Sequence, residues 1–482
     1  MKIPEEIKEI VEKIEKAGFE AFIVGGCVRD FLMGRTPQDW DITTNAKPEE
    51  LQEIFEDSFY ENQFGTVGVK IKEGEQTKEV VEVTTYRIES KYTDKRHPDE
   101  IKFAETLEED LKRRDFTVNA LAMDARGEIV DLFGGKDDIK KKIIMAVGSP
   151  EERFNEDALR MMRAIRFAAT LNFEIERETF EAVKKHHQLL QVISKERIRD
   201  ELIKIINSAN ASQGVELLRD AELLKNMIPE LLEGVGVGQN LHHIYSVWEH
   251  NLRALQYTCD KNYSLGVRLA ALLHDVGKPK SKRGEGYNST FYGHEMVGAR
   301  MTAKIMDRLK FPKDITEKVI KLVRFHLFYY NPGEVTESSV RRLVANIGKE
   351  NVEDLLKVRE ADRIGSGTPK AVPYKLRHLK FMIDKVSRDP ISPKMLKIDG
   401  NDVMKLLNIE QGPKVGMIMN ALMEEVLDEP SKNTSECLEK RVKELDRMSG
   451  SELMELAKKG KIKTAEKEEE EIGEIKERHH VK

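Results

Sequence analysis

The stretch Ala21-Phe22-Ile23-Val24-Gly25-Gly26-Cys27-Val28-Arg29-Asp30 is followed, after one short expected helix, by Asp39-Trp40-Asp41-Ile42. The four apolar residues at its start predict a strand, and a helix is expected directly after the two glycines. Glycines at such a turn let the backbone approach a ligand, and the N–H groups of the new helix face an anion. Gly25 and Gly26 therefore predict a phosphate-binding turn, to which Arg29 can add a guanidinium.

Asp39 and Asp41 form the second feature of this stretch. Residues i and i+2 of a strand point to the same face, so two carboxylates would be presented together. Phosphoryl transfer uses two divalent metals between such groups, and Mg²⁺ prefers one or two carboxylates with substrate phosphates. A solvated Asp-x-Asp turn is the alternative for the pair alone, but the preceding Gly-Gly turn favours metal-assisted phosphoryl transfer. Glu82 is a candidate third carboxylate, with an exposed strand position as an equal alternative.

Length and composition set the class of protein. At roughly 150 residues per domain, 482 residues predict about three units. Hydrophobic residues make up 39% and charged residues 34% of the chain, and the three cysteines, Cys27, Cys259 and Cys437, form no close pair. No apolar run approaches the ~20 residues that span a bilayer, and no signal peptide is expected. We therefore expect a cytoplasmic protein with no membrane partner. The net charge of −6 argues only weakly against nucleic acid.

The pattern of apolar residues predicts an α+β fold, in which a small mixed-sheet domain precedes a largely all-α remainder. After about residue 149 the strand signals nearly vanish and helical periodicity takes over. Strands are expected at 21–24, 41–43, 66–71, 80–85, 120–123 and 129–132, and early helices at 5–17, 28–33 and 48–55.

The Gly25–Asp41 segment resembles the signature of the class II tRNA nucleotidyltransferase and bacterial poly(A) polymerase family. Three further segments match the pattern of that family in order. Arg113–Leu121 (RRDFTVNAL) resembles its ribose-and-triphosphate motif, Glu156–Arg163 (EDALRMMR) its base-reading motif, and Glu196–Leu202 (ERIRDEL) its neck-stabilising motif. The resemblance is dense over roughly residues 10–220.

This resemblance places Asp115 and Asn119 near the sugar of a nucleotide, where an acceptor and an amide can test a 2′-hydroxyl. It places Arg114 against the triphosphate. A solvated basic pair, Arg113 with Arg114 beside Glu108-Glu109-Asp110, is the alternative.

Asp157 and Arg160 are three residues apart and hence neighbours on one helix face. An ionised Asp only accepts hydrogen bonds and an Arg only donates them. Together they fit a base edge with an exocyclic amine beside a ring-nitrogen acceptor, which cytosine and adenine share. An ordinary salt bridge between the two is the alternative. Arg163 continues the face and is expected to contact phosphate or to hold Asp157.

Two further segments bear on the acceptor. The polar, basic segment 89–98 matches a loop that, in the family it resembles, helps the site switch from C to A; a plain polar loop is the alternative. Segments 398–404 and 412–416 resemble the helical tail that grips tRNA, with a plain helix–loop–helix as the alternative. The charged stretch 465–482 is expected to be a solvated helix end or a disordered tail.

A separate pattern of histidines and aspartates occupies residues 241–362. Ligands of these types on successive helices are a normal way to hold a metal in a helical bundle. The order resembles the HD phosphohydrolase superfamily, whose ligands match His250, His274, Asp275 and Asp362. His294 and His326 are candidates for a second metal. The resemblance implies phosphodiesterase or phosphatase activity with a divalent transition metal or Mg²⁺. His242 and His243 are left between helix capping and substrate contact.

These observations predict a nucleotidyltransferase head over residues 1–150, a nucleotide-reading neck over 151–215, an HD body over 216–375 and a tRNA-binding tail over 376–482. The predicted reaction is template-independent addition of CCA to the 3′ end of tRNA from CTP and ATP, with Mg²⁺ at Asp39 and Asp41. An A-adding enzyme or poly(A) polymerase is the alternative in the same class. The alternative from another class of enzyme is an HD phosphodiesterase or phosphatase whose head only binds RNA. A nonenzymatic RNA-binding protein is the third alternative. No oligomeric state is predicted.

Overall fold

The computed structural model describes residues 2–37, 39–62, 65–73, 76–90, 100–240, 244–387 and 395–481. The chain divides into two compact units. Unit 1 comprises residues 1–327 and 353–371, and unit 2 comprises residues 328–352 and 372–482. The finer division at residues 150, 215 and 375 remains a prediction.

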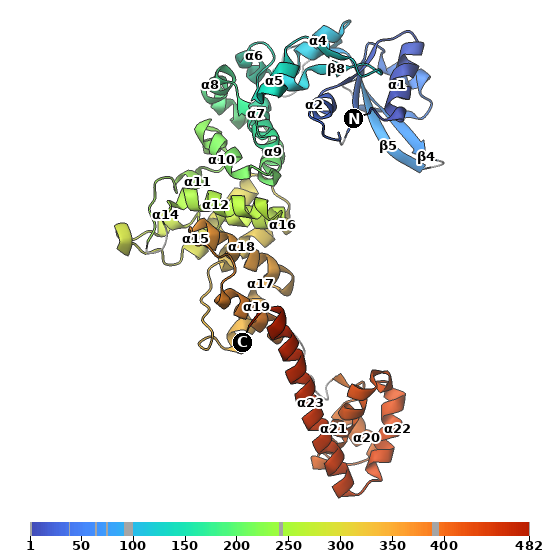
Figure 1. The fold of residues 1–482 in the computed structure, drawn as a ribbon, viewed down its shortest axis with the longest axis vertical. Coiled ribbons are helices and arrows are strands. Elements are labelled where there is room, and N and C mark those ends of the chain that lie inside the picture. The colour runs from blue at the N-terminus through green and yellow to red at the C-terminus, as the bar shows by residue number, and fades with distance from the viewer. Residues whose placement is uncertain are drawn as a thin grey trace. The chain divides into compact units, whose positions relative to one another are not determined.

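The first part of unit 1 contains a mixed sheet with short helices (Figure 1). Its elements are α1 (Glu5–Lys16), β1 (Ala21–Val24), α2 (Gly26–Leu32), β2 (Asp41–Thr44), α3 (Pro48–Ile54), β3 (Ser58–Asn62), β4 (Thr66–Glu73), β5 (Gln76–Thr85), β6 (Arg87–Ser90), β7 (Glu100–Phe103), α4 (Leu107–Lys112), the 3-10 turn η1 (Thr117–Asn119), β8 (Leu121–Met123), β9 (Ile129–Asp131), α5 (Gly135–Lys141) and β10 (Ile143–Ile144).

The main sheet has seven strands in the order β3-β4-β5-β2-β1-β8-β9. Strands β2 and β5 run parallel, whereas the other neighbours in this sheet run antiparallel. The predicted mixed sheet is thus confirmed, and each of the six predicted strands is present within a few residues. Strands β3, β6 and β7 were not predicted. The predicted loop 89–98 starts inside β6, and its residues 91–98 lie outside the described part of the chain.

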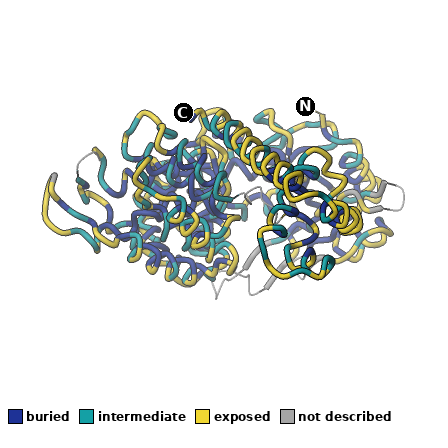
Figure 2. Tube along the Cα trace, turned by 90° about the horizontal axis from the view of Figure 1, so that it is seen from below, coloured by how far each residue is buried: buried dark blue, intermediate teal, exposed yellow. Residues whose placement is uncertain are grey.

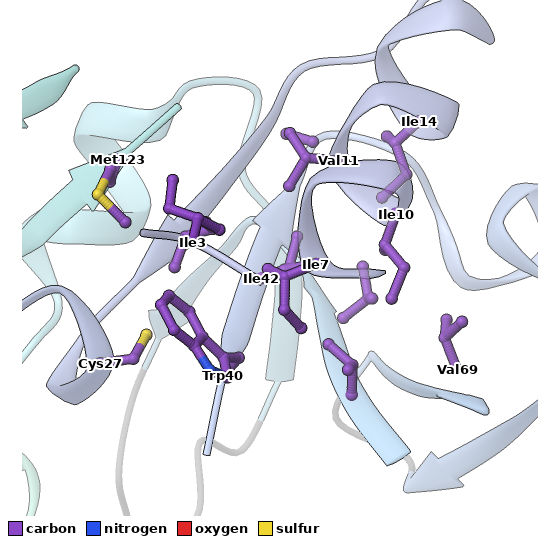
Figure 3. Packing of buried hydrophobic residues seen from close by; sticks show 14 of the residues in the cluster. Ile3, Ile7, Ile10, Val11, Ile14, Cys27, Trp40, Ile42, Val69 and Met123 are labelled. Carbon is purple, nitrogen blue, oxygen red and sulfur yellow. The ribbon is translucent and has the colours of Figure 1, made fainter. Parts of the chain in front are cut away.

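One face of this sheet carries the core of the head. The apolar side of α1 (Ile7, Ile10, Val11 and Ile14) packs in the same cluster as Ile42 from β2 (Figure 3). The other face carries a smaller cluster of Val24, Leu111 and Ala122. Side chains alternate between the two faces along a strand. Asp41 is the strand neighbour of Ile42, and Glu82 lies between Val81 and Val83, so both carboxylates lie on this second face.

The rest of unit 1 is helical. Its elements are α6 (Pro150–Glu156), α7 (Leu159–Leu171), β11 (Glu174–Ile175), α8 (Arg177–His186), η2 (His187–Val192), α9 (Lys195–Asn207), α10 (Ala211–Asp220), η3 (Leu223–Asn226), α11 (Pro229–Leu232), α12 (Val247–Asp260), α13 (Leu265–Leu273), α14 (Lys278–Ser281), η4 (Gly286–Asn288), α15 (His294–Arg308), α16 (Lys313–Phe325) and α18 (Val352–Gly365). Buried stretches recur between exposed ones along the trace, as amphipathic helices require (Figure 2).

Unit 2 is helical as well. It contains α17 (Glu337–Ile347), η5 (Lys349–Asn351), α19 (Tyr374–Ser387), α20 (Gly400–Leu407), α21 (Pro413–Asp428), η7 (Pro430–Lys432), α22 (Ser435–Asp446) and α23 (Gly450–Arg478). Leu453, near the start of α23, packs into the cluster formed by α20, α21 and α22. Near the other end, Ile475 and Val481 are buried against Phe381 of α19. The prediction that residues 465–482 are solvated is therefore wrong for these two side chains.

The contact between α21 and α23 depends on Gly460. A Cβ atom at this position would lie 2.2 Å from the backbone oxygen of Asn420 in α21. We predict that Gly460→Ala destabilises this contact by about 1–3 kcal/mol, because the backbone oxygen cannot move aside. Gly473→Ala in the same helix, where a Cβ would meet nothing within 4 Å, should stabilise the helix by about 1 kcal/mol. Hydrogen–deuterium exchange of the α21 amides measures both effects, and equal shifts in the two variants would contradict the packing argument.

Candidate functional site

Asp39 and Asp41 lie at the start of β2. The strand begins at Asp41, so the prediction that both residues belong to one strand is wrong for Asp39, which occupies the bend before it. Trp40 between them is buried in the core of the head (Figure 3). The pKa of the Asp41 carboxyl is raised above its usual value, mainly because the group is buried. The nearby Arg114 guanidinium opposes this shift, and the Asp39 carboxylate adds to it. The two carboxylates are thus close enough to repel, as a shared cation site requires.

Glu82 lies beside Asp41 in the sheet. Strands β2 and β5 are parallel, and Asp41 and Glu82 are direct partners in their register. Neighbouring strands are about 4.8 Å apart, and paired side chains share a face. The Glu82 side chain is exposed on that face. The register therefore favours the third-carboxylate interpretation over a plain exposed strand position.

The Gly-Gly turn brings Arg114 to the same place. Gly25 has a φ of +81°, which favours glycine, and α2 starts at Gly26. A Cβ on Gly25 would lie 2.9 Å from Arg114 Nη1 and 3.9 Å from Asp41 Oδ2. The missing side chain thus leaves room for a guanidinium beside the carboxylates. The structure therefore brings Gly25, Arg114, Asp41 and Glu82 together beside the central strands, on one face of the sheet.

Asp110 is a functional position that the sequence analysis missed. Its fully buried carboxylate pairs with Arg113 at 2.6 Å and with Arg114 at 3.3 Å. Burial raises its pKa, but the two guanidiniums reverse this and hold the pKa below its usual value. The alternative of a solvated Arg113–Arg114 pair is therefore wrong. The spacings of three and four residues along α4 were the signal that could have revealed Asp110.

A chain of buried polar side chains links the Gly-Gly turn to helix α7. Arg29 Nη1 donates to Asn119 Oδ1 at 2.6 Å, and Asn119 Nδ2 donates to Asp115 Oδ1 at 3.1 Å. Arg163 Nε donates to Asp115 Oδ2 at 2.7 Å. Arg163 thus holds Asp115, whereas the sequence analysis expected it to contact phosphate or Asp157. Burial raises the pKa of Asp115, but Arg163, Arg160 and Asn119 bring it down to about 2.

Asp157 and Arg160 lie at the junction of α6 and α7, and each has protein partners. The Asp157 carboxylate accepts from the Leu159 backbone N–H at 2.9 Å and from Arg197 Nη2 at 2.8 Å. Arg160 donates to Glu156 at 2.8 Å and to the Arg113 backbone oxygen at 2.8 Å. Both side chains are therefore oriented by groups that the predicted motifs themselves supply.

A second set of candidate residues meets in the helical body. His250 comes from α12, His274 and Asp275 follow α13, and Asp362 comes from α18. His250 Nε2 lies 2.8 Å from His274 Nε2, 3.1 Å from Asp275 Oδ2 and 3.4 Å from Asp362 Oδ1. Ligands at 2.0–2.2 Å from one metal would be roughly 3.3–3.6 Å apart in a tetrahedral site and roughly 2.8–3.1 Å apart in an octahedral one. The separations therefore fit one divalent cation.

The other oxygen of Asp275 faces a second pair of histidines. Asp275 Oδ1 lies 3.3 Å from His294 Nε2 and 3.7 Å from His326 Nε2. The two groups of potential metal ligands, His250–His274–Asp275 and Asp275–His294–His326, thus share one carboxylate. The predicted set of six residues is brought together, whereas His242 and His243 lie outside the described residues.

The tautomers of three of these histidines suit metal binding. Nδ1 of His274, of His294 and of His326 lies 2.7–2.8 Å from the backbone oxygen three residues earlier. A carbonyl can only accept, so each Nδ1 carries a proton, and Nε2 is the ring nitrogen that faces the centre and would bind a metal in the neutral ring. His294 Nε2 and Asp275 Oδ1 are buried and accept no hydrogen bond within the described residues. These buried lone pairs fit a metal cation.

The electrostatics agree with a cation site. Burial lowers the pKa of His274, but Asp275 and Asp362 raise it to about 10. Burial raises the pKa of both carboxyls, yet the surrounding cations hold each well below its usual value. In His326, burial and the His274 charge lower the pKa to about 3. The centre therefore requires positive charge between its carboxylates.

Three known families match the chain. Residues 21–145 match the poly(A) polymerase head domain, residues 172–234 match the probable RNA- and SrmB-binding site of polymerase A, and residues 247–365 match the HD domain. Fold and sites thus define a nucleotidyltransferase-type head joined to an HD metal centre, and both domains imply dependence on divalent metals. Over these segments the chain is similar to the head and RNA-binding region of poly(A) polymerases and to the HD domain, and each of the three family models matches less than half of the chain.

Among curated relatives, the CCA-adding enzyme of Ligilactobacillus salivarius (strain UCC118) is 51% identical over 227 residues, which are 46% of this chain and 55% of the relative. That of Enterococcus faecalis (strain ATCC 700802 / V583) is 46% identical over 240 residues, 49% of this chain and 58% of the relative. The chain thus spans about half the length of the curated relatives it matches.

Solved structures resemble the chain over most of its length. The Bacillus stearothermophilus CCA-adding enzyme in complex with CTP has a TM-score of 0.60 at 28% identity and covers 93% of this chain and 98% of its own. The Thermotoga maritima CCA-adding enzyme complexed with tRNA has a TM-score of 0.54 at 20% identity, covering 92% and 97%, which shows a common fold alone. Among the described residues, no helix is both long and apolar enough to cross a membrane.

The buried Asp115 generates a prediction about stability and pH. Because its pKa falls from 3.8 to about 2 on folding, its ionised form contributes about 2–3 kcal/mol to the free energy of unfolding at neutral pH. This contribution is complete above about pH 4 and is lost as the pH falls through 2. We therefore expect Asp115→Asn to lower the calorimetric unfolding temperature equally from pH 7 to pH 5, and the gap to narrow below pH 4. Asp137→Asn, on the exposed side of α5, is the matched control and should cost less than about 0.5 kcal/mol. A gap that persists unchanged to pH 3 would contradict the assigned pKa.

Proposed function

We propose that the chain adds CCA to the 3′ end of tRNA without a template, using CTP and ATP. The observation that carries this proposal is the convergence of Asp41, Glu82, Gly25 and Arg114 on one face of the sheet. Relatives named CCA-adding enzyme are 50–51% identical to this chain over the matched segments. Since the proposed acceptor is tRNA, we also propose that the protein acts in the cytoplasm.

In the proposed reaction, the RNA 3′-hydroxyl attacks the α-phosphate of the nucleotide and pyrophosphate leaves. Asp39, Asp41 and Glu82 would hold the divalent cations, which we propose to be Mg²⁺ and which supply charge to the attacking and leaving oxygens. Arg114, which is fixed by Asp110, would bind the triphosphate beside Gly25. The contribution of the protein is then mainly positioning and charge neutralisation.

The chain Arg29–Asn119–Asp115–Arg163 supports a role in shaping the nucleotide site. The Asn119 amide and the Asp115 carboxylate are already bonded to protein partners. We therefore propose that they fix the sugar side of the site as a preformed set, with Gly26 at the turn where Arg29 packs. A preformed set loses little side-chain entropy when the nucleotide binds.

For base selection we propose Asp157 and Arg160. The Asp157 carboxylate is oriented by Arg197 and the Arg160 guanidinium by Glu156. An acceptor and a donor held in this way match the amine and the ring nitrogen of cytosine and adenine, whereas uracil and guanine present the reverse. Selection of two bases would thus rest on two side chains.

For the body we propose a second activity, metal-dependent hydrolysis of phosphoesters. The observation that favours it is the pair of ligand sets that share Asp275. His250, His274, Asp275 and Asp362 would hold one cation, and His294 and His326 with Asp275 a second. A metal-bound water is a nucleophile near neutral pH, which is the chemistry such cations supply.

The product of the head reaction tests the main proposal. We expect tRNA that lacks CCA to gain two cytidines and one adenosine when CTP and ATP are present. Asp39→Ala should abolish incorporation while tRNA still binds, because the variant loses the cation site and keeps the RNA-binding surfaces. Gel sizing of products with each single nucleotide is the measurement. A long A tail, or addition only to tRNA ending in CC, would support the alternative A-adding or poly(A) enzyme, and full incorporation by Asp39→Ala would contradict the site.

The body reaction is tested by reciprocal variants. We expect His274→Ala to reduce hydrolysis of bis(4-nitrophenyl) phosphate by at least about 100-fold, since a metal ligand is lost, and to leave cytidine incorporation unchanged. Asp39→Ala should show the opposite pattern. The two rates are measured on the same preparations, with calorimetric unfolding as the control for folding. Loss of both activities in either single variant would mean that the centres are not separate. Hydrolysis in the native chain without any incorporation would support the HD hydrolase alternative.

A further inference from the structure

A buried lysine lies against the shared carboxylate of the HD centre. Lys278, the first residue of α14, is 7% exposed, and its Nζ lies 2.6 Å from Asp275 Oδ2. This is the oxygen that also faces His250 and His274, at 3.1 and 3.2 Å. An ammonium group and a metal cation therefore compete for the same carboxylate oxygen, and the outcome depends on what else holds the ammonium.

Gln239 holds it. Lys278 Nζ donates to Gln239 Oε1 at 2.6 Å, and Gln239 Nε2 donates to the backbone oxygen of Tyr245 at 3.2 Å. Gln239 is itself 9% exposed. It lies in the segment between residues 234 and 247, which neither the RNA-binding family nor the HD family covers. The ammonium group thus depends on a side chain from outside the HD domain.

The physical consequence follows from the cost of burying charge. A buried ammonium costs several kcal/mol unless acceptors replace its water. With Gln239 in place, the amide oxygen shares this task with Asp275. Without it, the ammonium would depend more strongly on Asp275 Oδ2, and a metal would have to displace a tighter ion pair. Groups that orient a ligating carboxylate typically change metal affinity by roughly 10–100-fold.

We propose that Gln239 is a positioning residue of the HD metal centre. It shares the Lys278 ammonium with Asp275 Oδ2. The ion pair is therefore weaker than one with the carboxylate alone, and a metal on the His250–His274 side can compete for Oδ2. The inference rests on the proposed metal centre, but it needs no hydrolytic activity. It also assigns a function to the connecting segment: that segment completes the centre.

Metal binding by the full chain tests this inference. The probe is Mn²⁺ in competition with a chromophoric chelator, and HD-dependent binding is the part that disappears in His274→Ala. We expect Gln239→Leu to weaken HD-dependent affinity by roughly 10–100-fold, and Gln239→Glu, which keeps the acceptor, to retain it. Asn240→Leu is the matched control, because it removes a hydrogen bond of the same segment, from Asn240 Nδ2 to the Ser289 backbone oxygen at 2.7 Å, without touching Lys278.

A double-mutant cycle separates the proposed role from a merely structural one. If Gln239 acts through the ammonium, Gln239→Leu should have no further effect on a Lys278→Met background. Equal losses in Gln239→Leu and Asn240→Leu, additive losses in the cycle, or unchanged affinity in Gln239→Leu would each overturn the inference while leaving the HD centre intact. Absence of any His274-dependent Mn²⁺ binding in the native chain would instead overturn the centre itself, and the inference with it.

Discussion

The ion pair between Asp115 and Arg163 is the contact on which the head and the helix α7 both depend. The Asp115 carboxylate is buried and Arg163 is partly buried, with its guanidinium 5.3 Å from the centre of the Phe167 ring. Breaking one partner of such a pair leaves an uncompensated buried charge, which is far more costly than removing both. Through Asn119 and Arg29 the same network reaches the Gly-Gly turn. The turn proposed to bind phosphate and the residues proposed to shape the sugar side are therefore linked by one hydrogen-bonded network.

The HD centre also contains buried carboxylates, and positive charge from several sources can neutralise them. Its carboxylates and histidine nitrogens face one another at separations that like lone pairs do not tolerate in a dry interior. In the protein, His274 and Lys278 supply positive charge there. A divalent cation supplies it more directly. Helix α15 can bring His294 close only because of Gly277, where a Cβ would lie 2.3 Å from the His294 backbone oxygen. Close helix packing thus sets the spacing of the ligands.

Much of this could be predicted from the sequence, for identifiable reasons. Strong periodicity predicted the strands β1, β2, β4, β5, β8 and β9 and the helices α1, α2 and α3. The order of histidines and aspartates indicated the body cluster. Three things could not be predicted. Asp39 lies in the bend before β2, so the two-residue spacing of a strand does not describe how its side chain is placed relative to Asp41. Gln239 acts through Lys278, which only the tertiary structure brings near. The charged composition of residues 465–482 predicted a solvated segment, but Ile475 and Val481 are buried against Phe381.

That last contact changes how the tail is connected. The chain leaves α19, forms the cluster of α20, α21 and α22, and returns along α23 to pack again on α19. The tail is therefore attached to α19 in two ways: through the chain that follows α19 and through the apolar contact at the end of α23. A segment attached at both ends explores fewer orientations than one on a single tether. A large, rigid ligand that engages such a tail forfeits less orientational entropy than it would on a free arm, and the apolar attachment determines how much less.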